Sequence, residues 1–401
     1  MNLDFSIVAR RCVAAMILSM SAAPARADVE VDLRQGGGSV RADSATGDLG
    51  GLTVRGPQLW SDEGALSERY RGAVLPWDMV REVRGDSAGI GDFLAIGEDL
   101  WRARIRIERG DEALAQPILA KHWARFRDAE GPTAALAAEG LLRVALANGD
   151  IRAAAEPWLA CLRHRSAGIA SRFPGLPAAF DADNGLLPVL SPFMPESRRA
   201  DLIAACDAAR ASGEAGDVAR LVVRIARGEV ATGAGEAAGA TKPSDAAKSD
   251  GTKSDGTKSD GTKSDGTRTA PPSVRALSLL ADISGAADAR VLERAVGAFD
   301  RAFDEPPSYL AAWRLAAIGT CRARLARALP ADAARASALG RAALDLLAVP
   351  AAGLDASGLV DAYALEEAGR LLREAGDDAS ASQLDALARE KVKDSTRSMA
   401  R

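Results

Sequence analysis

The feature of the sequence that most constrains the fold is a Gly-Asp pair that recurs between segments of helical periodicity. Glycine readily takes the left-handed backbone conformation that ends a helix, and aspartate caps the free N–H groups that open the next helix. Each pair therefore predicts a joint between two packed helices. The pairs are Gly110-Asp111, Gly149-Asp150, Gly216-Asp217 and Gly376-Asp377.

The segments beside these joints repeat apolar residues every three or four positions, which places them on one face of an α-helix. An alanine also stands five residues after three of the joint glycines, at Ala115, Ala154 and Ala381, whereas Leu221 stands at the remaining joint. Two of the apolar faces are formed by Ala134, Ala138, Leu141, Leu142 and Ala145, and by Leu292, Ala295, Val296, Phe299 and Phe303.

This pattern resembles the tetratricopeptide-repeat (TPR) family of helical hairpins, in which glycine occupies the turn and a small residue lies early in the second helix, where the two helices touch. Ala103 and Gly369 match the small residue that the family places seven positions before the turn glycine. The first two joints are 39 residues apart, whereas the repeat of the family is about 34 residues long. The family's Trp and Tyr positions are not filled. The resemblance implies roughly four to six hairpins between residues 91 and 393, and a generic α-helical solenoid or bundle is the alternative.

Residues 28–86 have a different pattern, in which apolar and polar residues alternate as they do in half-buried strands. The strand-like runs are Val29–Leu33, Leu52–Val54 and Val74–Val83, with glycines and polar residues between them. We expect a small antiparallel sheet or barrel. The Val-x-Val run and the later Pro-Trp-Asp-x-Val-x-x-Val segment resemble SH3- or Sm-like β modules. That resemblance places Trp77 in the core and gives it no binding role.

Residues 1–27 have the three parts of a cleavable signal peptide. Arg10 and Arg11 form a positive region, Cys12–Ala23 is a short apolar run, and Ala25-Arg26-Ala27 matches a cleavage site. We expect cleavage between Ala27 and Asp28 and a periplasmic or secreted protein. A membrane anchor is the alternative, but the apolar run has 12 residues and a span needs about 20. We expect no membrane span in the mature chain.

Residues 229–272 contain no aromatic residue, and Lys-Ser-Asp-Gly-Thr is repeated in tandem four times over Lys248–Thr267. Such a composition cannot bury enough apolar surface to offset the entropy of the chain. We therefore expect a disordered, low-complexity linker between a helical-hairpin domain at 91–228 and a second helical domain at 273–393.

A second interruption lies between Phe173 and Pro195, where five prolines exclude a continuous helix. The segment is rich in Phe, Leu and Met, so we expect it to pack back against the helical body.

Three cysteines remain after the predicted cleavage: Cys161, Cys206 and Cys321. An odd number at wide spacing is not a disulfide framework. Their helical apolar surroundings favour buried free thiols, and a bridge between two of them in an oxidising compartment stays open. The net charge of −4 lacks the basic excess of a nucleic-acid binder, so we expect no nucleic-acid partner.

The sequence contains two histidines, His122 and His164. A metal site needs roughly three or four converging ligands, and only His164 has a partner within reach, Cys161 on the same helix face. This Cys–His pair is a minor alternative as a nucleophile and its base. Asp181–Gly185 partly matches a calcium loop but lacks its later Gly and Glu, and an Asx turn explains it better. We predict no catalytic, cofactor-binding or metal-binding residues.

Trp101, Trp123, Trp158 and Trp313 all lie in helical segments. Core packing is the expected role of each. The functional alternative is that one or two of them line a concave groove that receives a peptide of a partner.

A helical-hairpin body behind a predicted signal peptide, without a catalytic motif, predicts an exported, non-enzymatic interaction or scaffold protein that binds protein or peptide. The alternatives are an enzyme or enzyme accessory subunit of unknown type, and a structural component of the cell envelope. Histidine-based chemistry would have to use His122 or His164, so the positions of these two residues test the enzyme alternative.

Overall fold

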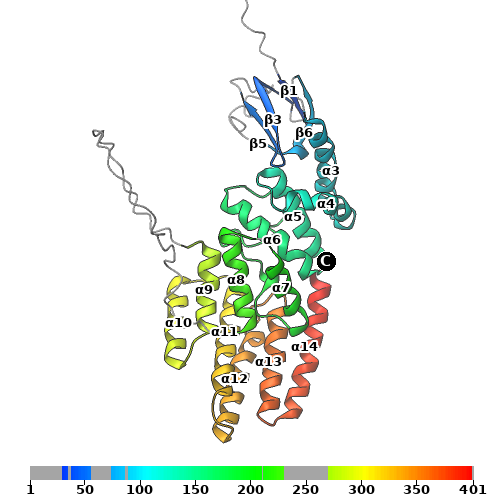
Figure 1. Ribbon diagram of the computed structural model, residues 1–401. Helices are drawn as coiled ribbons and strands as arrows, with labels where there is room; N and C mark the ends of the chain where they lie inside the picture. The colour runs from blue at the N-terminus through cyan, green and yellow to red at the C-terminus, as the bar shows by residue number, and fades with distance from the viewer. Residues whose placement is uncertain are drawn as a thin grey trace, which may run out of the picture. The chain divides into compact units, whose positions relative to one another are not determined.

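The chain consists of two compact units, Met1–Ala179 and Phe180–Arg401 (Figure 1). The computed structural model describes residues 29–34, 38–55, 74–85, 89–209, 211–229 and 270–399. The predicted signal peptide and residues 230–269, which hold the Lys-Ser-Asp-Gly-Thr repeats, lie outside the described residues. The described part is mainly helical with a small sheet region near its start, so the predicted fold class is confirmed.

The first unit begins with two three-stranded antiparallel sheets. In one sheet β1 (Val29–Leu33) lies between β2 (Ser39–Ala42) and β6 (Val80–Arg84), and in the other β4 (Leu52–Arg55) lies between β3 (Ser44–Gly47) and β5 (Val74–Leu75). Only Asp43 separates β2 from β3, so one run of chain supplies an edge strand to each sheet. The apolar side chains of β1 are buried and the acidic ones between them are partly exposed, as the predicted alternation requires.

The strand-like run predicted over Val74–Val83 is divided in two. A short 3-10 helix, η1 (Trp77–Met79), follows Pro76 and separates β5 from β6. The division occurs because proline has no N–H to donate to a strand partner. The predicted core position of Trp77 is confirmed: it is fully buried, and its Nε1–H donates to the Asp48 carbonyl at 2.6 Å.

The sheets are joined to the first helix, α3 (Gly91–Glu108), through close contacts around η1. The ring of Trp77 stacks on Phe93, with centroids 5.1 Å apart. A Cβ atom on Gly97 would lie 2.4 Å from the carbonyl oxygen of Trp77, so only glycine fits at that position. The fully buried carboxylate of Asp78 pairs with the guanidinium of Arg104. Burial raises the pKa of Asp78 although Arg104 and Arg172 act in the opposite direction.

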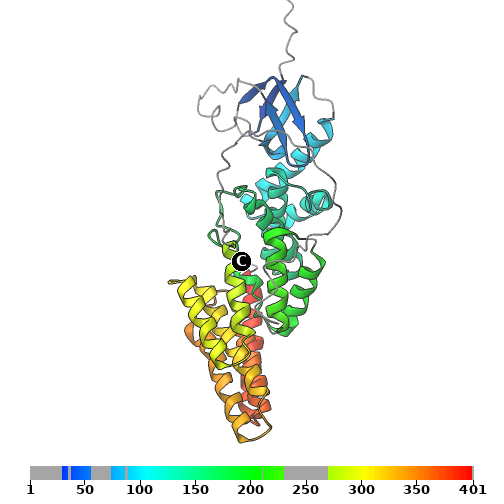
Figure 2. The ribbon, with the colours of Figure 1, turned by 60° about the vertical axis from the view of Figure 1, so that its left-hand side comes forward.

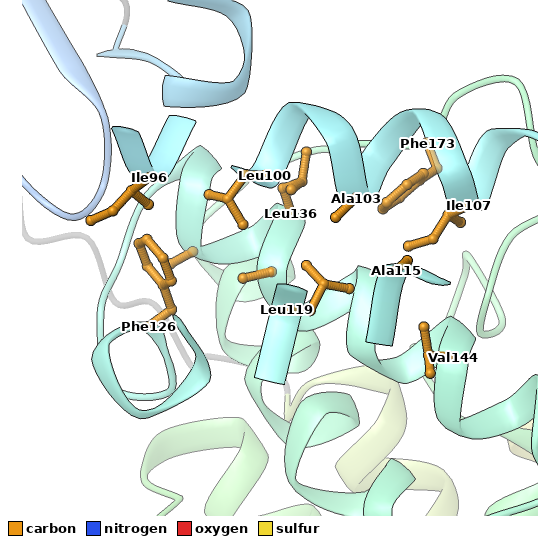
Figure 3. Close-up of a cluster of buried hydrophobic side chains, with 12 residues drawn as sticks. Ile96, Leu100, Ala103, Ile107, Ala115, Leu119, Phe126, Leu136, Val144 and Phe173 are labelled. Atoms are coloured by element: carbon orange, nitrogen blue, oxygen red, sulfur yellow. The ribbon is translucent and has the colours of Figure 1, made fainter. Parts of the chain in front are cut away.

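Two helical hairpins complete the first unit. In the first hairpin α3 packs against α4 (Glu112–Phe126), and in the second α5 (Pro132–Ala147) packs against α6 (Ile151–Ser166). Helix α5 also contacts both α3 and α4, so the hairpins stack on each other. Figure 3 shows the buried core of these hairpins. Within the first hairpin, Leu100 and Ala103 of α3 face Ala115 and Leu119 of α4. Ala103, Ala115 and Ala154, which the sequence predicts at helix contacts, are fully buried.

The second unit contains eight α-helices among the described residues, and each packs against its neighbour along the chain. Figure 2 shows the later ones, coloured yellow to red, lying side by side. Helix α11 also contacts α9 and α13, so alternate helices touch as well. The helices are α7 (Glu196–Ala208), α8 (Gly213–Arg227), α9 (Pro272–Ser284), α10 (Ala289–Ala302), α11 (Ser308–Arg327), α12 (Ala333–Ala352), α13 (Leu359–Glu374) and α14 (Asp378–Met399).

Three of the four predicted joints are confirmed. Gly110, Gly149 and Gly376 take positive φ angles of 79°, 64° and 93° and separate α3 from α4, α5 from α6, and α13 from α14. At each joint the N–H of the following aspartate donates to a carbonyl of the preceding helix five residues earlier, which is the Schellman pattern. The side chains of Asp150 and Asp377 also cap the helices that follow.

The predicted joint at Gly216-Asp217 is wrong, because both residues lie inside α8. The glycine with positive φ at this turn is Gly213, at 58°, three residues earlier. Gly216 has a packing role instead: a Cβ atom there would lie 2.7 Å from the carbonyl oxygen of Ala211.

The proline-rich segment before α7 contains only one short helix, the 3-10 helix η2 (Pro188–Leu190). Its apolar residues Leu186, Leu190, Phe193 and Met194 are buried. The prediction that this segment is not a continuous helix and packs back on the body is therefore confirmed.

The predicted linker at 229–272 connects two helices that pack against each other. Helix α8 contacts α9, and Ser273 Oγ donates to Glu214 Oε1. Because of this packing α7 and α8 belong with the later helices, and the division between compact units falls after Ala179 rather than in the linker.

Candidate functional site

The candidate site is a groove in the first unit, between α4, α5 and α6, with a volume of about 310 Å³. We call it the Trp123 groove. Its residues come from both hairpins, so the groove exists only because the hairpins stack. It is lined by Gln116, Ala120, Trp123, Leu141, Val144, Ala145, Asn148, Asp150, Arg152, Ala153, Glu156 and Pro157.

Trp123 is the aromatic side chain of the groove and is half-buried. Its Nε1–H donates to Glu156 Oε2 at 3.1 Å, a bond that runs from α4 to α6. The bond fixes the indole ring beside a carboxylate. Leu141, Val144 and Ala145 of α5 supply apolar surface in the same groove. The groove thus combines an aromatic ring, an apolar wall and a negative charge.

Backbone geometry adds a hydrogen-bond acceptor to the groove. Pro157 lies inside α6 and has no N–H, so the carbonyl of Ala153, one turn earlier, lacks its usual donor. Ala153 is exposed and lines the groove. Nearby, Asn148 Nδ2 donates to Gln116 Oε1 at a long distance of 3.5 Å, which leaves both side-chain amides able to bind a ligand.

The ionisable side chains of the groove are two acids and one base. Asp150 caps α6 by accepting from the Ala153 N–H at 2.9 Å through one carboxylate oxygen, so its other oxygen is left for solvent or a ligand. Glu156 accepts from Trp123, and Arg152 lies exposed on the first turn of α6. The lining therefore carries a net negative charge.

The other three tryptophans differ from Trp123. Trp158 and Trp313 are each 1% exposed, so their predicted core role is confirmed. Trp101 is half-buried beneath the guanidinium of Arg34, which lies 5.2 Å from the ring centre. Trp101, Trp158 and Trp313 do not line the Trp123 groove.

The two histidines are both buried. His122 is 6% exposed, and its Nε2 lies 2.9 Å from Asp99 Oδ2 of the neighbouring helix. Burial would raise the pKa of Asp99, but hydrogen bonds from Lys121 and His122 outweigh it and lower the pKa. His122 therefore joins α4 to α3 and does not open into the groove.

His164 is 3% exposed, and burial lowers its pKa to about 4. Cys161, its neighbour on α6, is also buried, and burial raises the pKa of the thiol well above its usual value. A nucleophilic pair needs a thiolate and a basic imidazole. Both shifts act against that chemistry.

Cys161, Cys206 and Cys321 are free and buried, as predicted. Burial raises the pKa of Cys206 to about 12 and also raises that of Cys321. These thiols are therefore packing residues.

The Asp181–Gly185 segment is the Asx turn that the sequence predicts. Asp181 Oδ1 accepts from the N–H groups of Asp183 and Asn184 at 2.9 and 3.1 Å. Tyr309 of α11 donates to Asp181 Oδ2 and accepts from Asn184 Nδ2. The polar groups of the segment thus anchor it to α11.

The second unit has a wider groove, of about 700 Å³, between the start of α10 and the helices α11 and α12. It is lined mainly by alanines, and two of its charged side chains, Arg322 and Asp345, pair with each other at 2.5 Å. It has no aromatic residue. The Trp123 groove is the stronger candidate because its polar groups surround an aromatic ring.

Sequence reasoning missed most of the groove. It placed Trp123 on a helix but gave no role to Glu156, Asn148 or Gln116. One signal was present: Pro117 and Pro157 both interrupt the second helix of a hairpin, and each marks a carbonyl without a helical donor.

Among the described residues, no three His, Cys, Asp or Glu side chains lie close enough to hold a metal ion together. In the same ranges, no helix combines the length and the apolar character that crossing a membrane requires. Comparison of the chain with protein-family models, with curated proteins and with solved structures gave no match.

Proposed function

We propose that this is an exported, non-enzymatic interaction protein of the periplasm or cell envelope, which binds a partner protein or peptide through a TPR-like helical surface. The observation that carries the proposal is the Trp123 groove, in which two stacked hairpins present an aromatic ring, an apolar wall and several polar groups. Such concave surfaces between stacked hairpins suit the binding of extended chains.

The kinship with TPR hairpins is supported by the joints and by the helix contacts. Gly110 and Gly149 end the first helix of each hairpin, and Ala115 and Ala154 are buried where the second helix meets the first. Contacts between alternate helices, such as α3 with α5, are those of a stacked array. The kinship of the β region with SH3- or Sm-like modules is supported by its two small sheets and by the buried Trp77.

A non-enzymatic role is supported by the positions of His122 and His164. Both are buried, and neither lines the Trp123 groove or the groove of the second unit. Export is supported by the sequence of residues 1–27, and N-terminal sequencing of the protein from its native host should give Asp28 as the first residue. A chain that keeps Met1 would contradict export.

Binding is tested by affinity capture from the envelope fraction of the native host, at native abundance. We expect the wild-type protein to recover a specific partner that Trp123→Ala loses. Leu114→Ala is the matched control, because Leu114 is 56% exposed on α4 but does not line the groove. Recovery of the same proteins by the wild type and by Trp123→Ala would contradict a binding role for the groove.

A further inference from the structure

We propose that the Trp123 groove binds the lysine or arginine side chain of an extended, basic segment of the partner. This inference rests on the proposed function, since it names the chemistry that the same groove recognises. The groove has a volume of about 310 Å³, at the lower end of the range for ligand pockets. A space of this size suits one long side chain and the backbone beside it.

The aromatic ring and its neighbour favour a cation. A positive group over the face of an indole is attracted by the π electrons of the ring. Glu156 Oε2 accepts a hydrogen bond of 3.1 Å from Nε1–H at the edge of the Trp123 ring. A cation on this ring therefore also lies close to a carboxylate. The two attractions act on the same position and reinforce each other.

The remaining polar groups are mostly acceptors. The Gln116 and Asn148 amides carry both donors and acceptors. The groups that only accept are the free oxygen of Asp150, the carboxylate of Glu156 and the Ala153 carbonyl that Pro157 leaves without a helical donor. Lysine and arginine heads carry only donors, so they match this set. Arg152 is the single base of the lining and lies exposed on the first turn of α6, and it leaves the two acids in excess.

The apolar wall fits the stem of the same side chain. Leu141, Val144 and Ala145 lie on one helix and line the groove. Lysine and arginine cover apolar surface with their methylene groups while the charged head stays with polar partners. An acidic side chain would meet two carboxylates. A short apolar one would add no donor for the second oxygen of Asp150 or for the Ala153 carbonyl.

The test uses the purified full chain and three blocked, alanine-rich peptides that differ only in a central Arg, Leu or Glu. Binding is measured by calorimetry at low and at moderate salt. We expect the Arg peptide to bind at least about tenfold more tightly than the Leu peptide, with weaker binding at higher salt, and the Glu peptide not to bind. Glu156→Gln should weaken binding of the Arg peptide by about tenfold, because an amide oxygen still accepts from Trp123 but the charge is lost.

Two further variants complete the test. Trp123→Phe keeps a π face and should weaken binding less than Trp123→Ala does. Glu130→Gln removes an acid from the same unit outside the groove and should leave binding unchanged. Melting curves establish that each variant is folded.

The outcomes separate this inference from the proposed function. Binding of the Leu or Glu peptide as tightly as the Arg peptide, with loss in Trp123→Ala, would overturn the cation preference and leave a peptide-binding groove. An unchanged affinity in Glu156→Gln would also overturn the inference. Absence of binding by all three peptides would overturn it too, and the capture experiment then decides the proposed function independently.

Discussion

The two compact units hold their elements together by different means. In the first unit, the sheets join the helices through a few specific contacts around η1: the Trp77 ring on Phe93, the backbone of Trp77 against Gly97, and the buried Asp78–Arg104 pair. The second unit repeats one kind of contact, helix against helix, over many small residues. A single substitution at these contacts should therefore lower the stability of the first unit strongly. In the second unit a single substitution should have a smaller effect, because many similar contacts remain.

The ion pairs of the two units differ in the same way, as the buried Asp78–Arg104 pair and the pairs of Arg327 illustrate. Asp78 is 0% exposed and the Arg104 side chain is 8% exposed. Removing one partner of a buried pair is strongly destabilising, and loss of Arg104 would leave the Asp78 carboxylate with only the longer ion pair to Arg172, at 3.7 Å. In the second unit, Arg327 pairs with Glu367 and Glu374, but its side chain is 33% exposed and Arg370 also contacts Glu367. Loss of Arg327 leaves Glu367 with another partner.

The largest effect is expected from Arg104→Met. It should lower the free energy of unfolding of the first unit by about 3–5 kcal/mol. The matched variant Arg327→Met should lower that of the second unit by about 1 kcal/mol. Hydrogen exchange of peptides from each unit, at increasing urea concentration, measures both values in the full chain. Equal losses would remove the contrast between the units.

The next effect comes from adding one methyl group to a helical glycine. Gly97→Ala places Cβ 2.4 Å from a backbone carbonyl, which cannot move alone, so we expect a loss of about 3 kcal/mol. Gly319→Ala in the second unit meets Leu346 Cγ at 2.6 Å. It should cost less, about 1–2 kcal/mol, because the two closest atoms belong to a side chain that can shift, and the nearest backbone atom, the Leu346 nitrogen, lies farther away at 3.2 Å.

The control for both is Gly340→Ala in α12, where a Cβ atom would meet nothing within 4 Å. It should stabilise the second unit by about 0.5–1 kcal/mol, since alanine favours a helix over glycine. If Gly97→Ala also raises the free energy of unfolding of its unit, α3 does not approach the Trp77 backbone as closely as described.

The pH effect that depends on His164 should be confined to the first unit. Burial lowers the pKa of His164 to about 4 from a usual 6.5, so protonation of this ring favours the unfolded chain. Its contribution is fully present above pH 6.5 and is lost as the pH falls toward 4, with a slope of at most about 1.4 kcal/mol per pH unit. His164→Leu should remove this slope from the first unit. The second unit has no histidine, and its acids with shifted pKa values, such as Glu366 and Glu374, are the same in both proteins, so its pH dependence should not change in His164→Leu. An unchanged slope of the first unit in His164→Leu would contradict the assignment.

The smallest effect is expected from deleting residues 248–267. Because α8 packs directly against α9 on either side of this segment, the deletion removes none of the described contacts. The shorter connection should stabilise the second unit by about 0.6 kcal/mol or less. Calorimetric melting of the full chain measures the change. A clear drop in melting temperature would show that the repeats contribute to the folded structure.

The sequence predicted those parts of the fold that depend on local backbone conformation. The joints at Gly110, Gly149 and Gly376 were predicted because a helix end needs a positive φ at one residue. The Gly216 joint was wrong because two glycines lie near that turn, and Gly213 takes the positive φ. Strands β2 and β3 were missed because Ser39–Gly47 has few apolar residues, and its strand form comes from pairing with β1 and β4.

The candidate site could be predicted only in outline. Trp123 and Trp158 both lie in second helices of hairpins, and the sequence makes them equivalent. Their exposure differs because α6 is buried over more of its surface than α4 is, and local periodicity does not determine how far a helix is covered. The hydrogen bond from Trp123 to Glu156 joins residues 33 positions apart in the sequence and depends on the stacking of the two hairpins.

The central claim is that the sheets and α3–α6 form one cooperative unit, separate from residues 180–401. The most direct measurement is hydrogen exchange of the full chain carrying Trp77→Ala. The substitution removes a fully buried side chain from η1 and should cost the first unit about 3–5 kcal/mol. We predict that β1, β4, α3 and α5 lose protection together, whereas α11–α13 keep that of the wild type. Loss confined to the strands, or an equal loss in α11–α13, would contradict the claim.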